Sequence, residues 1–312
     1  MNRCFTLLAA LLVLVLGARP AYAWDDFGHR LVARIAWDNM TPQARARAIA
    51  ILHGAGADTG LRGTVSGTLT PQQQVDLFVF AATWPDVVRD TAQALRMEKY
   101  HHPYRHYVDT FWRQDTDFGP IQAVDRRQDG DLLRDAPRLQ SWLTSGNAEQ
   151  KALGLAWVLH LVGDIHQPLH ASGRVTPLDP YGDAGGNDFK LEETNPQTHA
   201  RRSLHSLWDG IMTSSIQRHS GESDAAFLAR AAHEVAGHHP RGEFATELGQ
   251  RDFREWAAAS VAIARRSVYA APLVRNQAAP AAYRQAAFQA AEPRVALAGY
   301  RLADILNQAL GH

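Results

Sequence analysis

Cysteine is nearly absent from this sequence of 312 residues. The one cysteine, Cys4, lies in a segment typical of a secretory signal, in which Arg3 precedes the apolar run LLAALLVLVLG and the end is ARPAYA. Ala21 and Ala23 occupy the small-residue positions that signal peptidase recognises. We therefore expect residues 1–23 to be removed by cleavage between Ala23 and Trp24. The mature chain then has no cysteine, which excludes disulfides even in an exported protein.

Further long hydrophobic runs and an excess of one charge are also missing. No apolar stretch of transmembrane length follows the first, so we expect no membrane anchor. The signal and the Ala- and Arg-rich composition indicate an exported bacterial protein, periplasmic or secreted. The chain has 32 Lys and Arg against 32 Asp and Glu, and losing Arg3 and Arg19 leaves 32 − 2 = 30 against 32. Proteins that bind polyanions through surface charge are basic, so any phosphate here must be neutralised locally.

Strand patterns are few, and helical periodicity dominates. The sequence predicts helices over residues 28–40, 42–53, 73–84, 135–146 and 147–166, and again from about 203 to 310. Thr41 and Pro42 predict the cap and first turn of the second helix, and the third is expected to stop before Pro85. Residues 54–70 and 172–198 have the composition of loops, and residues 100–130 are aromatic and irregular. We expect an all-α fold, with residues 24–312 forming a single domain.

The chemistry is concentrated in HLVGDIHQPLH, residues 160–170. His160 and Asp164 are four residues apart and share one helical face, and Pro168 breaks the helix so that His170 follows in the next turn. LHSLWD repeats the spacing with His205 and Asp209. Imidazole and carboxylate one turn apart are typical zinc ligands, whereas hydrogen-bonded core histidines are the alternative reading.

Two further candidates lie upstream. Asp86 follows AATWP at a helix end, and His106 lies in YRHYVD, where alternating polar and aromatic residues predict an extended segment. Taken alone, each is more typical of a structural residue than of a metal ligand.

Together, these motifs resemble those of a known family. They comprise an N-terminal Trp before Gly-His, an Ala-x-Trp-x-Asp, a His-aromatic-aliphatic-Asp, the block HLVGDIHQPLH, a GGN loop and LHSLWD, in this order. The chain resembles the trinuclear-zinc, single-strand-specific nucleases with 3′-nucleotidase activity, the nuclease S-one/P-one family, and AGYRLADILN near the end fits this resemblance. It implies the helical fold shared with zinc phospholipase C.

The resemblance also implies three Zn²⁺ ions per chain. One would be held by His29 and by the free α-amino group and carbonyl oxygen of Trp24, which become available only after cleavage. Asp164 would bridge this ion to a second one. The family pattern, carried onto this sequence, gives the second ion Asp86, His106 and His160 and the third ion His170, His205 and Asp209.

Substrate contacts follow from the same resemblance. Arg89, three residues after the catalytic Asp86, would contact phosphate, with a solvated helix charge as the alternative interpretation. Tyr107 would stack on the base, and Asn187 of the GGN loop would hydrogen-bond it. Asp183 either shapes that pocket or serves as a turn former. The implied partners are single-stranded DNA, RNA and 3′-nucleotides, cleaved to 5′-nucleotides by what we expect to be a monomer.

Two other functions are considered beside the nuclease. Zinc phospholipases C share the fold and most ligands, but their last ligand is a glutamate, whereas this chain has Asp209 and a GGN loop. A non-catalytic zinc protein would fill every coordination position with protein groups, and the unequal ligand sets leave positions open. The sequence therefore favours the nuclease.

Overall fold

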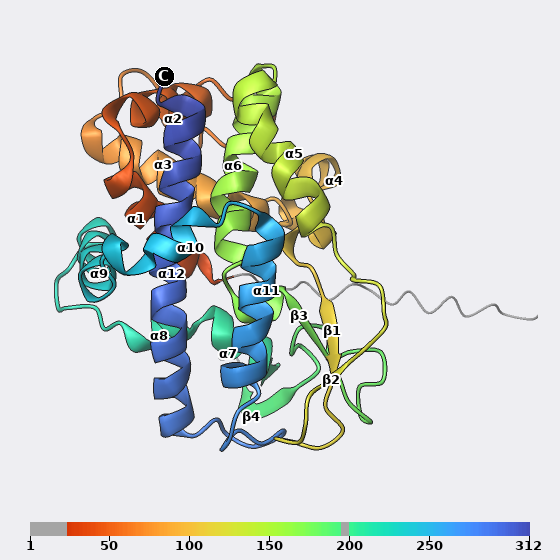
Figure 1. Cartoon of the computed structure of the whole chain (residues 1–312). Coiled ribbons are helices and arrows are strands. Elements are labelled where there is room, and N and C mark those ends of the chain that lie inside the picture. The colour runs from red at the N-terminus through yellow and green to blue at the C-terminus, as the bar shows by residue number, and fades with distance from the viewer. Residues whose placement is uncertain (1–23, 195–199) are drawn as a thin grey trace, which may run out of the picture.

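The computed structural model describes residues 24–194 and 200–312, and most of these are helical (Figure 1). This confirms the all-α expectation, while the predicted signal peptide lies outside the described residues. No helix among the described residues has the length and apolar character to cross a bilayer. The helices are α1 Asp26–Asn39, α2 Pro42–His53, α3 Pro71–Val87, α4 Ala94–Tyr100, α5 Leu132–Ser145, α6 Ala148–Asp164, α7 Leu204–Asp209, α8 Ile211–Ser215, α9 Asp224–His238, α10 Ala245–Gly249, α11 Phe253–Ile263 and α12 Ala281–Leu310.

Short turns of tighter or wider helix join several of these elements. The 3₁₀ turns are η1 Ala57–Thr59, η2 Thr91–Gln93, η3 Pro103–His106, η4 Pro168–His170 and η5 Arg241–Phe244, and η6 Ala264–Val268 is a π-helical turn. The predicted cap of the second helix is confirmed, because Thr41 accepts from the Ala44 amide at the start of α2. At the start of α6, Asn147 forms a reciprocal capping box with Gln150.

The prediction that the third helix stops before Pro85 is wrong, because α3 continues to Val87. Proline removes one helical hydrogen bond, but the Val88 amide still donates to the carbonyl of Trp84 at 3.0 Å, so the last turn is completed. Asp86 therefore lies on the final turn of a helix, where its backbone is fixed.

The core is built around α6, which lies between α3 and α5, and around α12, which runs beside α1 (Figure 1). Gly299 permits close approach of α12 and α1, because a Cβ there would lie 2.5 Å from Ile35 Cγ2. One buried apolar cluster extends from Trp24 to Leu310, so both ends of the described chain share it. The single-domain organisation remains a prediction.

Small sheets appear mainly in the two regions that were predicted to be irregular or loop, and β5 lies just after the second of them. The strands are β1 Thr110–Arg113, β2 Gln122–Ala123, β3 Ser172–Val175, β4 Lys190–Thr194 and β5 Arg201–Ser203. β1 pairs in parallel with β3, with Thr110 opposite Ser172, and β4 pairs with β5. Just before this pairing begins, the Val108 amide donates to the carbonyl of His170 at 2.8 Å. The sheet thereby places the segment after His106 against the segment that follows α6.

Candidate metal centre

Histidine and aspartate side chains form three groups whose ligand atoms lie within 4.8 Å of one another inside each group. Their residues come from α1, the end of α3, η3, the end of α6, η4 and α7. All but Asp86 are fully or almost fully buried. The groups are His29, His160 and Asp164; Asp86, His106 and His160; and His170, His205 and Asp209.

Asp164, at the C-terminal end of α6, lies at the centre of the first two groups. Its Oδ1 is 3.3 Å from His29 Nε2, and its Oδ2 is 3.3 Å from both His106 Nδ1 and His160 Nε2. The two oxygens thus face different sets of imidazoles. A carboxylate in this position can serve two adjacent ions, one with each oxygen.

Asp86 approaches the same histidines from the end of α3. Its carboxylate oxygens lie 4.0 Å from His106 Nδ1 and 4.0 Å from His160 Nε2. These two ring nitrogens are themselves only 2.9 Å apart. Ring nitrogens and carboxylate oxygens therefore converge on one point, as ligands of a single ion do.

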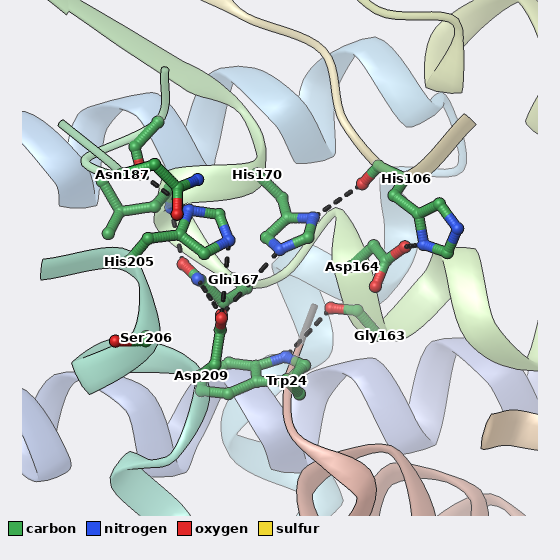
Figure 2. Close-up of polar contacts among 12 residues, drawn as sticks. Trp24, His106, Gly163, Asp164, Gln167, His170, Asn187, His205, Ser206 and Asp209 are labelled. Carbon is green, nitrogen blue, oxygen red and sulfur yellow. Dashed lines mark hydrogen bonds and ion pairs between the residues drawn. The ribbon is translucent and has the colours of Figure 1, made fainter. Parts of the chain in front are cut away.

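The third group is organised by α7 and by the turn after Pro168 (Figure 2). Asp209 Oδ1 lies 3.9 Å from His170 Nε2, and Asp209 Oδ2 lies 3.5 Å from His205 Nε2. Gln167 donates to Asp209 Oδ1 at 2.7 Å and accepts from the Leu169 amide, so it fixes one carboxylate oxygen and leaves the other available.

Backbone carbonyls hold three of the imidazole rings. Nδ1 of His160, His170 and His205 donates to the carbonyls of Ala82, His106 and Gly185 at 2.8, 2.7 and 2.6 Å, respectively. A carbonyl oxygen only accepts, so Nδ1 carries the proton and Nε2 keeps its lone pair. In all three residues Nε2 is the atom that faces the group's carboxylate. This is the outer support that metal-binding histidines require.

The buried polar atoms of these groups fit bound metal ions. Six of them have no hydrogen-bond partner among the described residues, namely both ring nitrogens of His29, both oxygens of Asp164, Asp86 Oδ1 and Asp209 Oδ2. Burial raises the pKa of the Asp164 and Asp209 carboxyls, raises the pKa of Asp86 to about 6, and lowers the pKa of His160 to about 3. Buried carboxylates are costly when unpaired, and divalent cations compensate that cost.

Trp24 is packed directly beside this cluster. Its side chain is fully buried, and its indole N–H donates to the carbonyl of Gly163, the residue before Asp164, at 3.0 Å (Figure 2). The glycines on both sides are sterically required, because a Cβ on Gly163 would lie 2.9 Å from His29 Nδ1 and a Cβ on Gly28 would lie 2.7 Å from Trp24 Cβ. The expected first residue of the mature chain therefore packs against Gly28 and Gly163, the residues that precede His29 and Asp164.

The predicted substrate residues belong to segments that also carry or support the ligands. Arg89 Nη1 lies 3.3 Å from Asp86 Oδ1, and its side chain is 21% exposed, so the guanidinium is near the ligands and also reaches solvent. Tyr107 is half-buried and follows His106. Asn187 donates to the carbonyl of Ala184 at 2.9 Å, within the same loop whose Gly185 carbonyl holds the His205 ring.

One local prediction here needs correction. His106 belongs to the 3₁₀ turn η3 and not to an extended segment, which begins only at Tyr107. Pro103 starts this turn by fixing its backbone angle at the first position. Alternation of polar and aromatic residues was therefore misleading, because it reflected a short turn followed by extended chain.

Sequence reasoning overlooked the residues that support the ligands. Besides Gln167, two buried arginines of α12 lie behind the turn after α6. Arg301 Nη1 contacts His166 Nε2 at 2.8 Å, and Arg294 donates to Ser260 Oγ, which in turn donates to the carbonyl of Ile165. Arg301 is part of the AGYRLADILN motif, but its partner His166 lies 135 residues earlier in the chain. The sequence pattern alone therefore does not predict this contact.

The chain is similar to known proteins over most of its length. Residues 24–311 match the model of the family described as S1/P1 Nuclease. The chain is 28% identical to "Nuclease S1" of Aspergillus oryzae over 219 residues, which are 68% of this chain and 61% of that protein. It is 25% identical to "Endonuclease 3" of Arabidopsis thaliana over 235 residues, which are 73% of this chain and 66% of that protein. The chain thus spans less than two thirds of the length of either relative.

Proposed function

The chain belongs to the S1/P1 nuclease family, and on this premise we propose that it is a zinc-dependent phosphodiesterase. It cleaves single-stranded DNA and RNA to 5′-nucleotides and also removes phosphate from 3′-nucleotides. The observation that carries this proposal is the set of three His and Asp groups with buried, unpartnered ligand atoms around Asp164 and Asp209.

We assign three Zn²⁺ ions to these groups. Trp24, through its α-amino group and carbonyl oxygen, and His29 hold one ion together with Asp164. Asp86, His106, His160 and Asp164 hold the second, and His170, His205 and Asp209 hold the third. The 3.3 Å contacts of the two Asp164 oxygens with different histidines support its role as the bridge.

Bound zinc would supply a water of lowered pKa as nucleophile and would neutralise charge on the phosphate and the leaving oxygen. The protein's own contribution is to keep the histidine ligands neutral and to hold all the ligands in their orientation. Burial lowers the pKa of His29 and His106 as well as that of His160, so these imidazoles are neutral at neutral pH and present lone pairs. Asp86 and Asp164 orient the reacting groups from the ends of two helices.

Arg89, Tyr107 and Asn187 would bind the nucleotide. The Arg89 guanidinium, which lies at the edge of the Asp86 group, would contact the phosphate. Tyr107 would stack on an unpaired base, which accounts for a preference for single strands because every base offers a π-face only when it is unstacked. Asn187 would hydrogen-bond that base from the GGN loop.

Export and assembly complete the proposal. The protein acts in the periplasm or outside the cell, after cleavage between Ala23 and Trp24, as a monomer of one domain. Exposure of the Trp24 amine by this cleavage links processing to metal binding, since an amide nitrogen is a far poorer ligand than an amine.

A single comparison tests the function. Mature enzyme of measured zinc content is assayed on single-stranded DNA, RNA, a 3′-nucleotide and phosphatidylcholine. We expect hydrolysis of the first three and three zinc ions per chain by elemental analysis. Preferential hydrolysis of phosphatidylcholine would identify a phospholipase C instead, and turnover of none of these substrates by fully loaded protein would contradict catalysis.

A further inference from the structure

Two neighbouring hollows lie along α11, which Figure 1 shows between α12 and the strands β1 and β3. The first has a volume of about 500 Å³ and lies between α11, the start of α5 and Thr110 of β1. The second has a volume of about 710 Å³ and lies between α5, the start of α11 and the end of α12. Arg254 lines both hollows, so we describe them as one groove.

The lining of this groove carries a strong excess of positive charge. Arg134, Arg251, Arg254 and Arg265 line it, against one acidic residue, Asp252. The whole chain, in contrast, has equal numbers of basic and acidic side chains. A local field of this kind attracts anions although the protein as a whole is neutral.

Neighbouring acids neutralise only part of this charge. Arg134 is paired with Asp131 and Asp135 at 2.9 Å. Arg254 lies 3.8 Å from Asp252 and its side chain is 81% exposed, so this contact is weak and screened. Neither Arg251 nor Arg265 makes an ion pair with any acidic residue in the described part of the chain; Arg251 contacts only the Gln308 amide oxygen, at 3.4 Å.

Arg265 is held in an unusual backbone setting. It lies in the π-helical turn η6, which directly follows α11, and such turns are frequent at functional sites. Its guanidinium carbon lies 5.7 Å from the Trp112 ring centre, and its Nε is buried without a hydrogen-bond partner among the described residues. A buried donor of a cation without a partner is costly, and an anion beside the same guanidinium would offset part of that cost.

The groove begins next to the proposed nucleotide site. At its near end, Gln128 donates to Thr110 Oγ1 at 2.7 Å. Residues 128–134 continue from there past Tyr107: a Cβ on Gly130 would lie 2.8 Å from Tyr107 Cδ2, and the Leu132 amide donates to the Tyr107 carbonyl at 3.2 Å. One face of this segment therefore contacts Tyr107, and its other residues, Leu133 and Arg134, line the groove.

The chemistry of the lining identifies the feature that it recognises. Small apolar residues of α11, including Ala257, Ala258 and Ala262, line the first hollow, and no aromatic side chain among the described residues does so. The second hollow is lined by Phe253, but this residue is buried, with 4% of its surface exposed. Bases therefore have no exposed ring to stack on in the groove, whereas arginines bind phosphate with paired donors. The groove suits a repeating phosphodiester backbone and not a particular base sequence.

We propose that the groove lined by Arg134, Arg251, Arg254 and Arg265 binds the backbone of single-stranded nucleic acid that extends beyond the nucleotide at the metal centre. This inference rests on the proposed nuclease function. Binding in the groove makes the enzyme more efficient on long strands than on dinucleotides, because only long strands reach both the metal centre and the groove.

The test compares substrates of two lengths in one double variant. Arg254→Gln with Arg265→Gln removes the arginine that lines both hollows and the arginine whose Nε has no hydrogen-bond partner among the described residues. The matched control, Arg34→Gln with Arg218→Gln, changes the net charge equally on residues that line neither hollow. We measure kcat/KM on oligothymidylate long enough to fill the groove and on a thymidine dinucleotide. Binding of a labelled, cleavage-resistant phosphorothioate strand is followed by fluorescence anisotropy as a function of salt.

For the groove variant we expect a several-fold loss of kcat/KM on the long strand and no change on the dinucleotide. The dependence of log Kd on log salt should become shallower by about 0.7 for each arginine that contacts a phosphate. The control should match the wild type in all three measurements. Equal losses on both substrate lengths, or unchanged salt dependence with an unchanged long-strand rate, would overturn the proposal. If the wild type cleaves neither substrate, the proposed function fails, whereas anisotropy still decides whether the groove binds strands.

Discussion

Replacing Gln167 by methionine tests how far the third metal group depends on its support. The Gln167 side chain makes two hydrogen bonds, a donation to Asp209 Oδ1 at 2.7 Å and an acceptance from the Leu169 amide at 2.6 Å. Gln167 is fully buried, and both hydrogen bonds therefore lie inside the protein. Gln167→Met keeps a side chain of similar length but removes both, so Asp209 is free to rotate away from His170 and His205.

The size of the effect follows from these contacts. A buried hydrogen bond to a charged group contributes about 1.5 to 3 kcal/mol. Loss of an outer partner of a metal ligand reduces metal affinity by about 10 to 100-fold, which corresponds to about 1.4 to 2.7 kcal/mol. The two estimates agree. We therefore expect one of three zinc ions to bind about 10 to 100-fold more weakly, while the other two are unaffected.

The measurement is a competitive titration of zinc against a chromophoric chelator. Losing the acceptor for the Leu169 amide should also cost about 1 kcal/mol of folding stability, in the manner of a lost helix cap. Gln150→Met is the matched control, since Gln150 caps α6 by accepting from the Asn147 amide and touches no metal group. It should lose similar stability and no zinc affinity. A Gln167→Met protein that retains three ions with wild-type affinity would refute the reasoning.

Four further predictions concern other residues. Asp164→Asn should lose more activity than any other change of one ligand, because Asp164 alone serves two ions; equal damage from Asp209→Ala with two ions still bound would contradict this. A cytoplasmic chain beginning Met-Trp24 should fold but turn over single-stranded DNA poorly until the methionine is removed, as rate measurements with N-terminal sequencing would show. Equal kcat with the methionine in place would exclude the amine as a ligand. Tyr107→Ala should raise KM by a factor corresponding to roughly 1 to 3 kcal/mol without loss of zinc in elemental analysis; an unchanged KM would remove Tyr107 from the site. Finally, burial raises the pKa of Asp183 from 3.8 to about 6, so its contribution to the free energy of unfolding is complete below pH 3.8 and is lost as the pH rises through about 6. This shift corresponds to about 3 kcal/mol, and Asp183→Asn should remove that pH dependence in urea unfolding of chelated protein; unchanged curves would count against it.

The parts of the fold that could be predicted are those encoded by nearby residues. Thr41 and Pro42 start α2 through interactions within four residues, and the periodicity of α6 is visible in one window. Pro85 misled the prediction because its cost depends on position within the helix, and the last turn tolerates it. The strands β1 and β3 were not predicted, because they pair with each other across about 60 residues and have no alternating pattern of their own.

The same distinction applies to the candidate site. The His160/Asp164 and His205/Asp209 pairs could be recognised because helical spacing alone places each pair on one face. Nothing local shows that His29 meets Asp164, 135 residues later, so that ligand came from the family resemblance. The role of Gln167 was not predicted, because glutamine is common in turns. That role depends on its hydrogen bond to Asp209 of α7, which the sequence does not show.

The close packing of α1 against α12 makes the candidate site depend on both ends of the described chain. His29 lies near the start of α1, just after Trp24, and this helix packs against Gly299 and its neighbours in α12. Local unfolding of α12 would therefore release the segment that carries Trp24 and His29. Metal binding by this group would thus report the integrity of a helix that contributes none of the assigned ligands.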